Sequence, residues 1–426
     1  MKKRIVITGM GVITTIGDNL SDFYQNLING KSGITKIKSI DSSKIACKIA
    51  GDLSDYDFNS KINYLKENIP EDYFKRLKKI FKTAPFSTKI TLLTAIDAYL
   101  NSGLFNFMPD KERISCFIGG HNLYDNYIAK NIRQFDIEPD YIDPLCGLVS
   151  FDADTVTSIA EVLQIYGHIC TIGGFCASSG LALKFAYDEI LLDNSDIVIV
   201  GGGSLDYSNI GFQALSMLEA ISYKSFNDNP EKASRPFDRD REGFVFSHGS
   251  GVIVLESLEH ALKRNANIYA EILAIDFNND ASHLPTPSVI GQTNIMNKVI
   301  KKSGIKKEDI NYINAHATST PLGDLIEIES IKKVFGEHAY KLKINATKSM
   351  IGHIGWTSNT IELIATILQM YNNKLHPTIN IENLDERIDL DVCANKSIDY
   401  NINYFMKNSF GMGGINCSLI GGKFIK

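Results

Sequence analysis

The second half of the chain alternates short apolar runs with segments that have helical spacing of apolar residues. Strands are expected at 269–275, 310–314 and 342–346, and helices at 291–303, 323–335 and 357–371. Such an alternation is typical of an α/β protein, and it predicts mostly parallel sheets. A chain of 426 residues has room for two or three domain-sized units, or for two fused halves that share one core.

The first half carries similar but more widely spaced segments. Strands are expected at 4–8, 113–119, 196–200 and 251–256, and helices at 20–29, 82–101 and 181–192. The first strand is expected to end at Gly9, and Ser21 is the predicted N-cap of the first helix. Near the end of the chain, a glycine-rich turn at 411–414 precedes a last strand at 415–420. We expect a division between the two halves near residues 257–268.

Composition narrows the functional classes. The net charge of −5 argues against general binding of nucleic acid. No apolar run reaches membrane-spanning length, and the N-terminal segment lacks the apolar stretch of a signal peptide. The seven cysteines form no CxxC pair, and their odd number leaves at least one thiol free or intermolecular. These features predict a soluble, cytoplasmic protein in a reducing compartment.

Cys176 is the most informative candidate for chemistry. It lies in Thr171-Ile-Gly-Gly-Phe-Cys-Ala-Ser-Ser-Gly180, just before a predicted helix. The free N–H groups and the dipole at a helix N-terminus favour a thiolate. A buried cysteine is more often a small hydrophobic residue, but the glycines and small side chains around this one leave room for a substrate.

Two later segments carry histidines that follow predicted strands. They are Asn314-Ala-His-Ala-Thr-Ser-Thr320 and Thr347-Lys-Ser-Met-Ile-Gly-His353. Ligand-binding loops of α/β sheets lie at such strand ends, and Gly352 and Gly355 suggest a tight turn that aims the imidazole of His353. One thiol, two histidines and Lys348 indicate covalent thioester chemistry. Asp324 and Glu327, at the start of the next helix, are either dipole partners or functional groups.

Other site classes lack their motifs. No HExxH or similar pair exists, so no metal is predicted. The glycines at 9 and 11 are followed by Thr14 where a dinucleotide-binding motif has its third glycine.

Taken together, these segments resemble the β-ketoacyl–acyl carrier protein synthases of the thiolase superfamily, the elongating ketosynthase type. The resemblance runs from Val6-Ile-Thr-Gly-Met-Gly-Val12 through Ala233-Ser-Arg-Pro-Phe-Asp238 to Asn408-Ser-Phe-Gly-Met-Gly-Gly-Ile-Asn416. It implies a five-layer αβαβα fold of two similar halves, 1–260 with the cysteine and 261–426 with the histidines. It also implies an acyl carrier protein as partner, and a homodimer or a heterodimer with a ketosynthase-like subunit.

The resemblance further implies roles for particular residues. Cys176 would accept the acyl chain, His316 and His353 would serve malonyl decarboxylation, and Lys348 would position and polarise this region. The N–H groups of Cys176 and Met412 would form an oxyanion hole, and Phe410 would lie beside the entrance. Thr318 and Thr320 would contact the phosphopantetheine arm of the carrier, and no metal or redox cofactor would be needed.

The segment from His316 to Asp324 is similar to stand-alone ketosynthases of polyketide clusters. We therefore expect condensation of carrier-bound chains, more in polyketide assembly than in fatty acid synthesis. The alternative is a malonyl-carrier decarboxylase that makes acetyl-carrier protein, although that group typically has Ser in place of Cys176. A silent heterodimer subunit is a third hypothesis. Phe175 precedes the nucleophile where smaller residues are common, and we expect it to reshape the acyl pocket.

Overall fold

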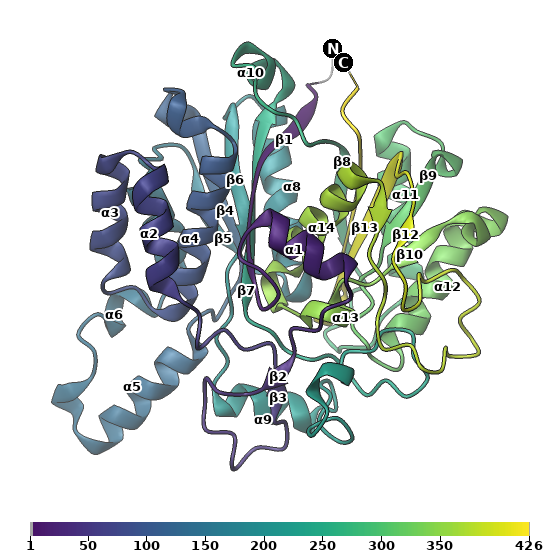
Figure 1. Cartoon of the computed structure of the whole chain (residues 1–426), viewed down its shortest axis with the longest axis horizontal. Coiled ribbons are helices and arrows are strands. Elements are labelled where there is room, and N and C mark those ends of the chain that lie inside the picture. The colour runs from purple at the N-terminus through teal and green to yellow at the C-terminus, as the bar shows by residue number, and fades with distance from the viewer. Residues whose placement is uncertain (1–2, 426) are drawn as a thin grey trace.

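Ten strands form one continuous mixed sheet that runs through the molecule (Figure 1). The computed structural model describes residues 3–425. The order along the sheet is β10-β9-β13-β14-β8-β1-β7-β6-β4-β5. From the first half of the chain come β1 (Ile5–Thr14), β4 (Ile114–Gly119), β5 (Ile169–Ile172), β6 (Ile197–Gly202) and β7 (Gly249–Ser257). From the second half come β8 (Ala270–Asn279), β9 (Ile310–Asn314), β10 (Lys343–Asn345), β13 (Tyr404–Gly411) and β14 (Ile415–Gly422).

The two halves repeat one topology. In each half, the last strand lies between the first strand and the fourth, and the second and third strands follow outward. The directions repeat as well. In each half the fifth strand pairs antiparallel with both the first and the fourth, and the second strand pairs parallel with both the fourth and the third. The halves join where β1 and β8 pair antiparallel, at Ile5–Ile7. The two similar halves expected from the sequence are confirmed.

The expectation of mostly parallel sheets is wrong. In the second half β13 turns back directly into β14 at residues 411–415, and a connection this short can join only antiparallel strands. The first half repeats the geometry, although a long excursion separates β6 from β7. The alternation of strands and helices in the sequence does not show whether a strand turns back antiparallel to its predecessor or follows a crossover and runs parallel to it.

Helices on both sides of the sheet halves complete the layers. Between the halves lie α8 (Ser178–Leu191) and α14 (Ser358–Asn372), which contact each other and strands of both halves. The outer face of the first half is covered by α4 (Phe86–Asn101) and α7 (Ala153–Leu163), and that of the second by α11 (Val289–Ser303) and α12 (Gly323–Phe335). The result is the αβαβα arrangement. Because α14 is packed on all sides, nearly its whole surface is buried.

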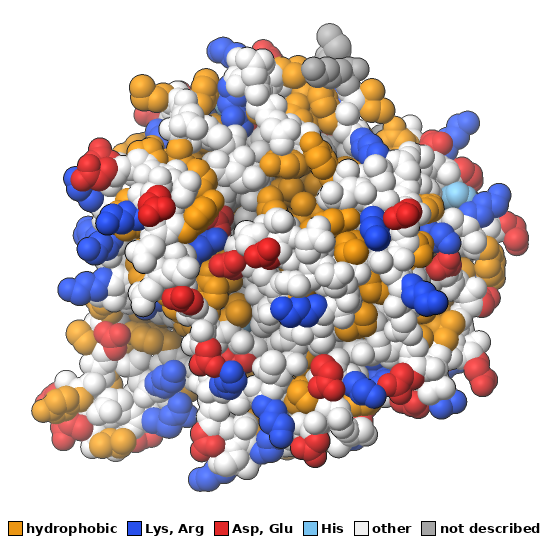
Figure 2. All heavy atoms as spheres, viewed as in Figure 1, with side chains coloured by type: hydrophobic (Ala, Val, Ile, Leu, Met, Phe, Trp, Pro, Cys, Tyr) orange, Lys and Arg blue, Asp and Glu red, His pale blue; other side chains and the backbone are white. Residues whose placement is uncertain are grey.

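Smaller elements extend from this core. They are α1 (Leu20–Ile28), α2 (Phe58–Asn68), α3 (Glu71–Phe81), α5 (Asp125–Ile137), α6 (Cys146–Val149), α9 (Asn209–Met217), α10 (Leu258–Lys263) and α13 (Lys348–Ile351), with short strands β2 (Thr35–Lys36), β3 (Ile49–Ala50), β11 (Lys374–Leu375) and β12 (Ile398–Asp399). Over α2 and α3, at the left of Figure 2, positive and negative side chains lie together.

Within residues 3–425, none of the helices is both long enough and apolar enough to cross a membrane.

Three predicted boundaries need correction. Residues 82–85 are not helical, since α3 ends at Phe81 and α4 begins after Pro85, which disfavours helical backbone in the residue before it. The N-cap of α1 is Asn19, not Ser21, because the Asn19 side chain accepts the N–H of Asp22 at 2.9 Å.

The third correction concerns β1, which continues through Gly9 and Gly11 to Thr14. A Cβ on Gly11 would lie 2.3 Å from the Thr94 carbonyl oxygen, and one on Gly9 would lie 2.4 Å from that of Ala98. These glycines therefore allow α4 to approach the strand and do not end it. The division of the chain into two halves near residue 260 stays a prediction from the sequence.

Candidate active site

Cys176 lies in the short 3-10 turn Phe175–Ala177, directly before α8. Phe175 takes a φ of +48°, a left-handed conformation that is strained for an aromatic residue and is typical of functional turns. The thiol is buried, and the backbone N–H groups of Cys176 and Met412 donate toward its sulfur. These two donors lie next to Sγ, where they can stabilise negative charge.

The protonation state of Cys176 differs from the expectation. Burial raises the pKa of the thiol to about 11, although Lys348 and the two N–H groups act in the opposite direction. The loss of hydration outweighs the helix terminus, because a buried thiolate has few water molecules to solvate it. The predicted thiolate is therefore wrong for the resting site, which holds a thiol at neutral pH.

His353 is the direct partner of that thiol. Its Nε2 lies 2.9 Å from Sγ of Cys176, and its Nδ1 lies 2.9 Å from Oγ of Ser358. Gly352 has a φ of +68° and Gly355 one of +53°, so the predicted glycine turn around this histidine is confirmed. Burial and the nearby lysines lower the pKa of His353 well below its ordinary value, so the imidazole is neutral.

His316 lies in the loop after β9, with its ring centre 5.8 Å from that of His353. The backbone N–H groups of His316 and Ala317 donate to the two carboxylate oxygens of Glu327, at 2.9 Å and 2.8 Å. Asp324 similarly accepts the N–H of Ser319 at 3.1 Å. The two carboxylates left open by the sequence thus anchor the histidine loop. Burial and the neighbouring cations also lower the pKa of His316 well below its ordinary value.

Lys348 reaches His316 from α13. Its Nζ lies 2.7 Å from the carbonyl oxygen of His316 and 3.5 Å from Nδ1. Lys348 does not line the cavity that contains Cys176, His316 and His353. The same ammonium lies 2.5 Å from Oε1 of Glu362, whose other oxygen is 2.7 Å from Nζ of Lys407.

The sequence reasoning missed Glu362, Lys407 and Ser358. Two of them carried a signal, since Glu362 is the one acidic residue in the otherwise uncharged segment 358–372 and Lys407 is the one basic residue in the strand 404–411. A lone charge inside a buried element needs a buried partner of opposite sign.

One cavity of about 340 Å³ joins most of the predicted site. It is lined by Cys176, His316, His353, Thr318, Thr320, Phe410 and Met412. Sγ of Cys176 and one ring nitrogen of each histidine lie within 4.8 Å of one another. The hydroxyls of Thr318 and Thr320 are 3.1 Å apart, and the Phe410 ring packs 5.9 Å from that of His316.

Phe175 lies apart from this cavity. Its ring packs against His121 and Trp356, at centroid distances of 5.3 Å and 6.4 Å, and His121 stacks on Trp356 at 4.2 Å. These three rings lie next to Cys176 in the fold, because Phe175 precedes it and the turn Gly355–Thr357, which contains Trp356, contacts the turn Phe175–Ala177.

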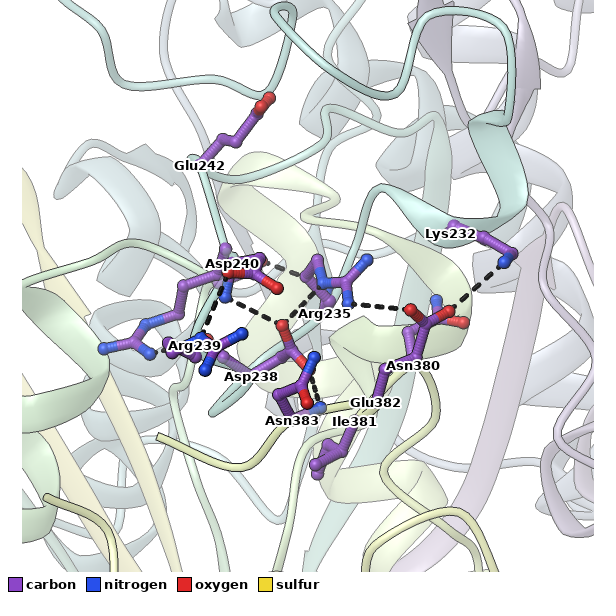
Figure 3. A network of polar contacts seen from close by, with 12 residues as sticks. Lys232, Arg235, Asp238, Arg239, Asp240, Glu242, Asn380, Ile381, Glu382 and Asn383 are labelled. Carbon is purple, nitrogen blue, oxygen red and sulfur yellow. Dashed lines mark hydrogen bonds and ion pairs between the residues drawn. The ribbon is translucent and has the colours of Figure 1, made fainter. Parts of the chain in front are cut away.

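The motif Ala233–Asp238 carries a polar network (Figure 3) and also contacts the loop 316–321, here called the threonine loop. In the figure, the side chain of Arg235 lies between Asp238 and Glu382, and its Nε is 2.9 Å from Asp238. The backbone N–H of Arg235 also donates to Oγ of Ser319 at 3.0 Å. Arg241 continues the support, because its guanidinium donates to the carbonyl oxygens of Thr320 and Pro321 at 3.0 Å and 2.7 Å.

The αβαβα fold is built from two similar halves, with a cysteine before one central helix and two histidines near the other. This combination defines a thiolase-like condensing enzyme. Comparison with known proteins gives the family. The N-terminal domain model of beta-ketoacyl synthases matches residues 2–261, and the C-terminal domain model matches residues 269–382. The chain belongs to the beta-ketoacyl synthase family and is an acyltransferase of the 3-oxoacyl-carrier-protein synthase type.

Relatives cover the whole chain. It is 35% identical to 3-oxoacyl-[acyl-carrier-protein] synthase 2 of Coxiella burnetii, over 98% of both chains, and 34% identical to the enzyme of that name from Synechocystis, over 98% and 97%. Among solved structures, the ishigamide ketosynthase/chain length factor matches with a TM-score of 0.88 and 26% identity, over 100% of both chains. A complex described as a type II PKS acyl-carrier protein with its ketosynthase bound to the hexaketide, AntDE:AntF, matches with a TM-score of 0.86 and 27% identity, also over 100% of both chains.

Proposed function

We propose that Cys176 carries the acyl chain during a decarboxylative condensation. The observation that carries the proposal is the 2.9 Å contact between Sγ of Cys176 and Nε2 of His353, in a cavity that also contains His316. A neutral imidazole can accept the thiol proton as sulfur attacks the thioester of an acyl-carrier protein. The N–H groups of Cys176 and Met412 then stabilise the tetrahedral oxyanion, and the proton passes to the departing carrier thiol.

In the second stage, malonyl-carrier protein loses CO₂. The bond to the carboxylate breaks and leaves its electron pair as an enolate, whose oxygen needs hydrogen-bond donors. An ammonium can only donate, so Lys348 beside Nδ1 of His316 favours the tautomer with hydrogen on Nε2. The Ser358 hydroxyl can donate or accept, so His353 can hold its hydrogen on Nε2 once the sulfur is acylated.

The enolate carbon then attacks the Cys176 thioester. A carbon–carbon bond forms, the carbon–sulfur bond breaks, and a β-ketoacyl-carrier protein leaves. The sulfur departs as a thiolate and takes up one proton from solvent. Every step uses groups of the chain and its substrates, so we propose that no metal or redox cofactor takes part.

Thr318 and Thr320 are proposed to bind the phosphopantetheine arm of the carrier. Their hydroxyls line the cavity that reaches Cys176, and the arm carries amide groups that pair with hydroxyls. The complex of a carrier protein with its ketosynthase among the structural relatives supports a carrier protein as partner. The same relatives support polyketide assembly as the context, and we propose that the protein acts in the cytoplasm. Neither the retained Cys176 nor these relatives favour the decarboxylase alternative.

We propose a homodimer formed at the free edge of the sheet. β5 is the last strand at that edge, and it is partly exposed, with the Ile169 side chain open to solvent. α8 contacts β5 and carries the exposed apolar residue Phe185. An unpaired, exposed edge strand is a template for pairing with another chain. Native mass spectrometry of the purified chain tests this, and a monomer that dimerises only with a ketosynthase-like subunit would instead support the heterodimer.

Intact-mass analysis tests the chemistry. The chain is incubated with acyl-carrier protein and then with malonyl-carrier protein. We expect an acyl adduct on the wild-type chain that is absent from Cys176→Ala, followed by a β-ketoacyl product on the carrier. Equal labelling of both chains would reject the assigned nucleophile, and acetyl-carrier protein as the sole product would favour the decarboxylase.

A further inference from the structure

Lys407 is a buried cation that the proposed mechanism leaves unused. It is fully buried in β13, where it pairs in register with Asn314 of β9, two residues before His316. Its ammonium donates to the carbonyl oxygen of Asn408 and lies 2.7 Å from Oε2 of Glu362. An ammonium taken out of water costs several kcal/mol unless it is paired, so its presence beside the site requires a reason.

Glu362 is shared between two cations. Its Oε1 pairs with Lys348 at 2.5 Å, and its Oε2 pairs with Lys407 at 2.7 Å. All three side chains are buried, at 1% exposure or less. One carboxylate cannot neutralise two ammonium groups, so one positive charge is left over. Lys348 places that charge beside His316, where its Nζ lies 2.7 Å from the carbonyl oxygen.

One further carboxylate, that of Glu327, faces the histidines, and within the described residues it forms no ion pair with Lys348 or Lys407. Glu327 of α12 carries a negative charge beside His316, and its oxygens accept the backbone N–H groups of residues 316 and 317 and the side chain of Asn408. Replacing Lys407 or Glu362 leaves this charge in place, so the charge differences between the variants below do not depend on it. His353 faces Cys176, Ser358 and the Phe244 ring, which carry no formal charge in the resting site. Burial is the main cause of the lowered pKa of each histidine, and Lys348 and Lys407 lower it further.

We propose that Lys407 is a positioning residue that acts through Glu362: by sharing this carboxylate, it leaves Lys348 as a cation that Glu362 does not fully neutralise in front of His316, and it adds to the effect of burial in keeping both imidazoles neutral. The inference deepens the condensation proposed above and rests on it. A protonated His353 could not accept the Cys176 proton. An imidazolium at His316 would repel Lys348.

The test compares pH profiles. Lys407→Met removes the excess charge, so both histidines should protonate at higher pH. We expect the acid limb of CO₂ release from malonyl-carrier protein to move up by about one pH unit, which is about a tenfold loss of rate at a fixed pH on that limb. Lys407→Arg keeps the cation and should keep the wild-type limb, even if its maximal rate falls.

Charge compensation sharpens the test. Lys407→Met combined with Glu362→Gln restores one excess positive charge, so its acid limb should return to the wild-type position. Glu362→Gln alone raises the excess and should move the limb to lower pH. Lys61→Met is the matched control, because Lys61 is a buried lysine paired with Asp97 away from the site. It should lower stability without moving the limb.

A second readout separates this inference from the proposed function. Ring ¹⁵N spectra of histidine-labelled chain report protonation of His316 and His353 directly, with assignments from His316→Asn and His353→Asn. A wild type that releases no CO₂ would contradict the condensation, while the ring titration would still test Lys407. The inference is overturned if Lys407→Met lowers the rate equally at every pH, or if the ring titrations of the single variant match those of the wild type.

Discussion

Nε2 of His353 lies 2.9 Å from Sγ of Cys176, although 177 residues separate them in the chain. The contact joins a histidine of the second half to a thiol of the first, where α14 and α8 begin side by side. With a pKa of about 11 for the thiol and a strongly lowered pKa for the imidazole, the resting pair is neutral. The nucleophile is therefore generated during the reaction and is not stored as an ion pair.

Alkylation of Cys176 should reflect this neutral pair. The pKa of the thiol is raised, so the thiolate fraction is small at pH 7, and the rate with iodoacetamide should keep rising as the pH approaches about 11. Mass spectrometry of the modified peptide measures the rate, and the exposed Cys170 serves as an internal comparison. A plateau by pH 8 would show that the site holds a thiolate after all.

Replacing the two histidines should separate the two stages. His353→Ala removes the proton acceptor of Cys176, so acylation should slow by roughly 10²–10⁴-fold, and decarboxylation should slow as well. His316→Ala removes only an enolate donor, so acylation should remain near the wild-type rate while CO₂ release falls by roughly 10²–10³-fold. Single-turnover acylation and CO₂ release are measured separately. Equal loss of acylation in both variants would contradict the division of roles.

Arg241 should control substrate binding through the threonine loop. Arg241→Lys keeps the charge but loses the fork that holds the carbonyl oxygens of Thr320 and Pro321. We expect a higher KM for carrier substrates with a smaller change in kcat, and a loss of about 1–3 kcal/mol in the free energy of unfolding. Arg239→Lys, at an exposed neighbouring position, should stay within about 0.5 kcal/mol. Unchanged KM in Arg241→Lys would speak against the support assigned to it.

Gly11→Ala tests the close approach of α4 to β1. The added Cβ would lie 2.3 Å from the Thr94 carbonyl oxygen, which is backbone and cannot rotate away. We expect a loss of about 1–3 kcal/mol or more in unfolding free energy, measured by urea denaturation. Gly147→Ala is the control, since its Cβ would meet no atom within 4 Å. Similar stabilities for the two variants would contradict the packing role of Gly11.

The sequence predicted the residues of the site better than their charges. Cys176, His316 and His353 were recognisable because each follows a strand and lies among glycines or small residues, a local pattern. The roles of Glu362 and Lys407 depend on a pairing across 45 residues between a helix and a strand, which no local pattern contains. The raised pKa of Cys176 has the same origin, since burial is a property of the assembled layers.

Among the elements, the segments 310–314 and 323–335 agree with β9 and α12 residue for residue, because each is bounded by clear polar or glycine signals. The directions of the strands were the weak point. β14 pairs antiparallel with both β13 and β8, which depends on a turn at 411–415 and on the repeat in the other half. The αβαβα architecture was predicted through the family resemblance, and the helix–strand alternation alone left the layers open.

The shared topology of the two halves has a consequence for synthesis of the protein. A nascent chain that has emerged only as far as β8 already contains the sulfur but neither imidazole, and its exposed helix α8 still lacks the packing of α14. Such an intermediate can bury Cys176 only after the later half docks. Catalytic competence therefore requires that the later half has docked, and the appearance of acylation during translation would time the docking.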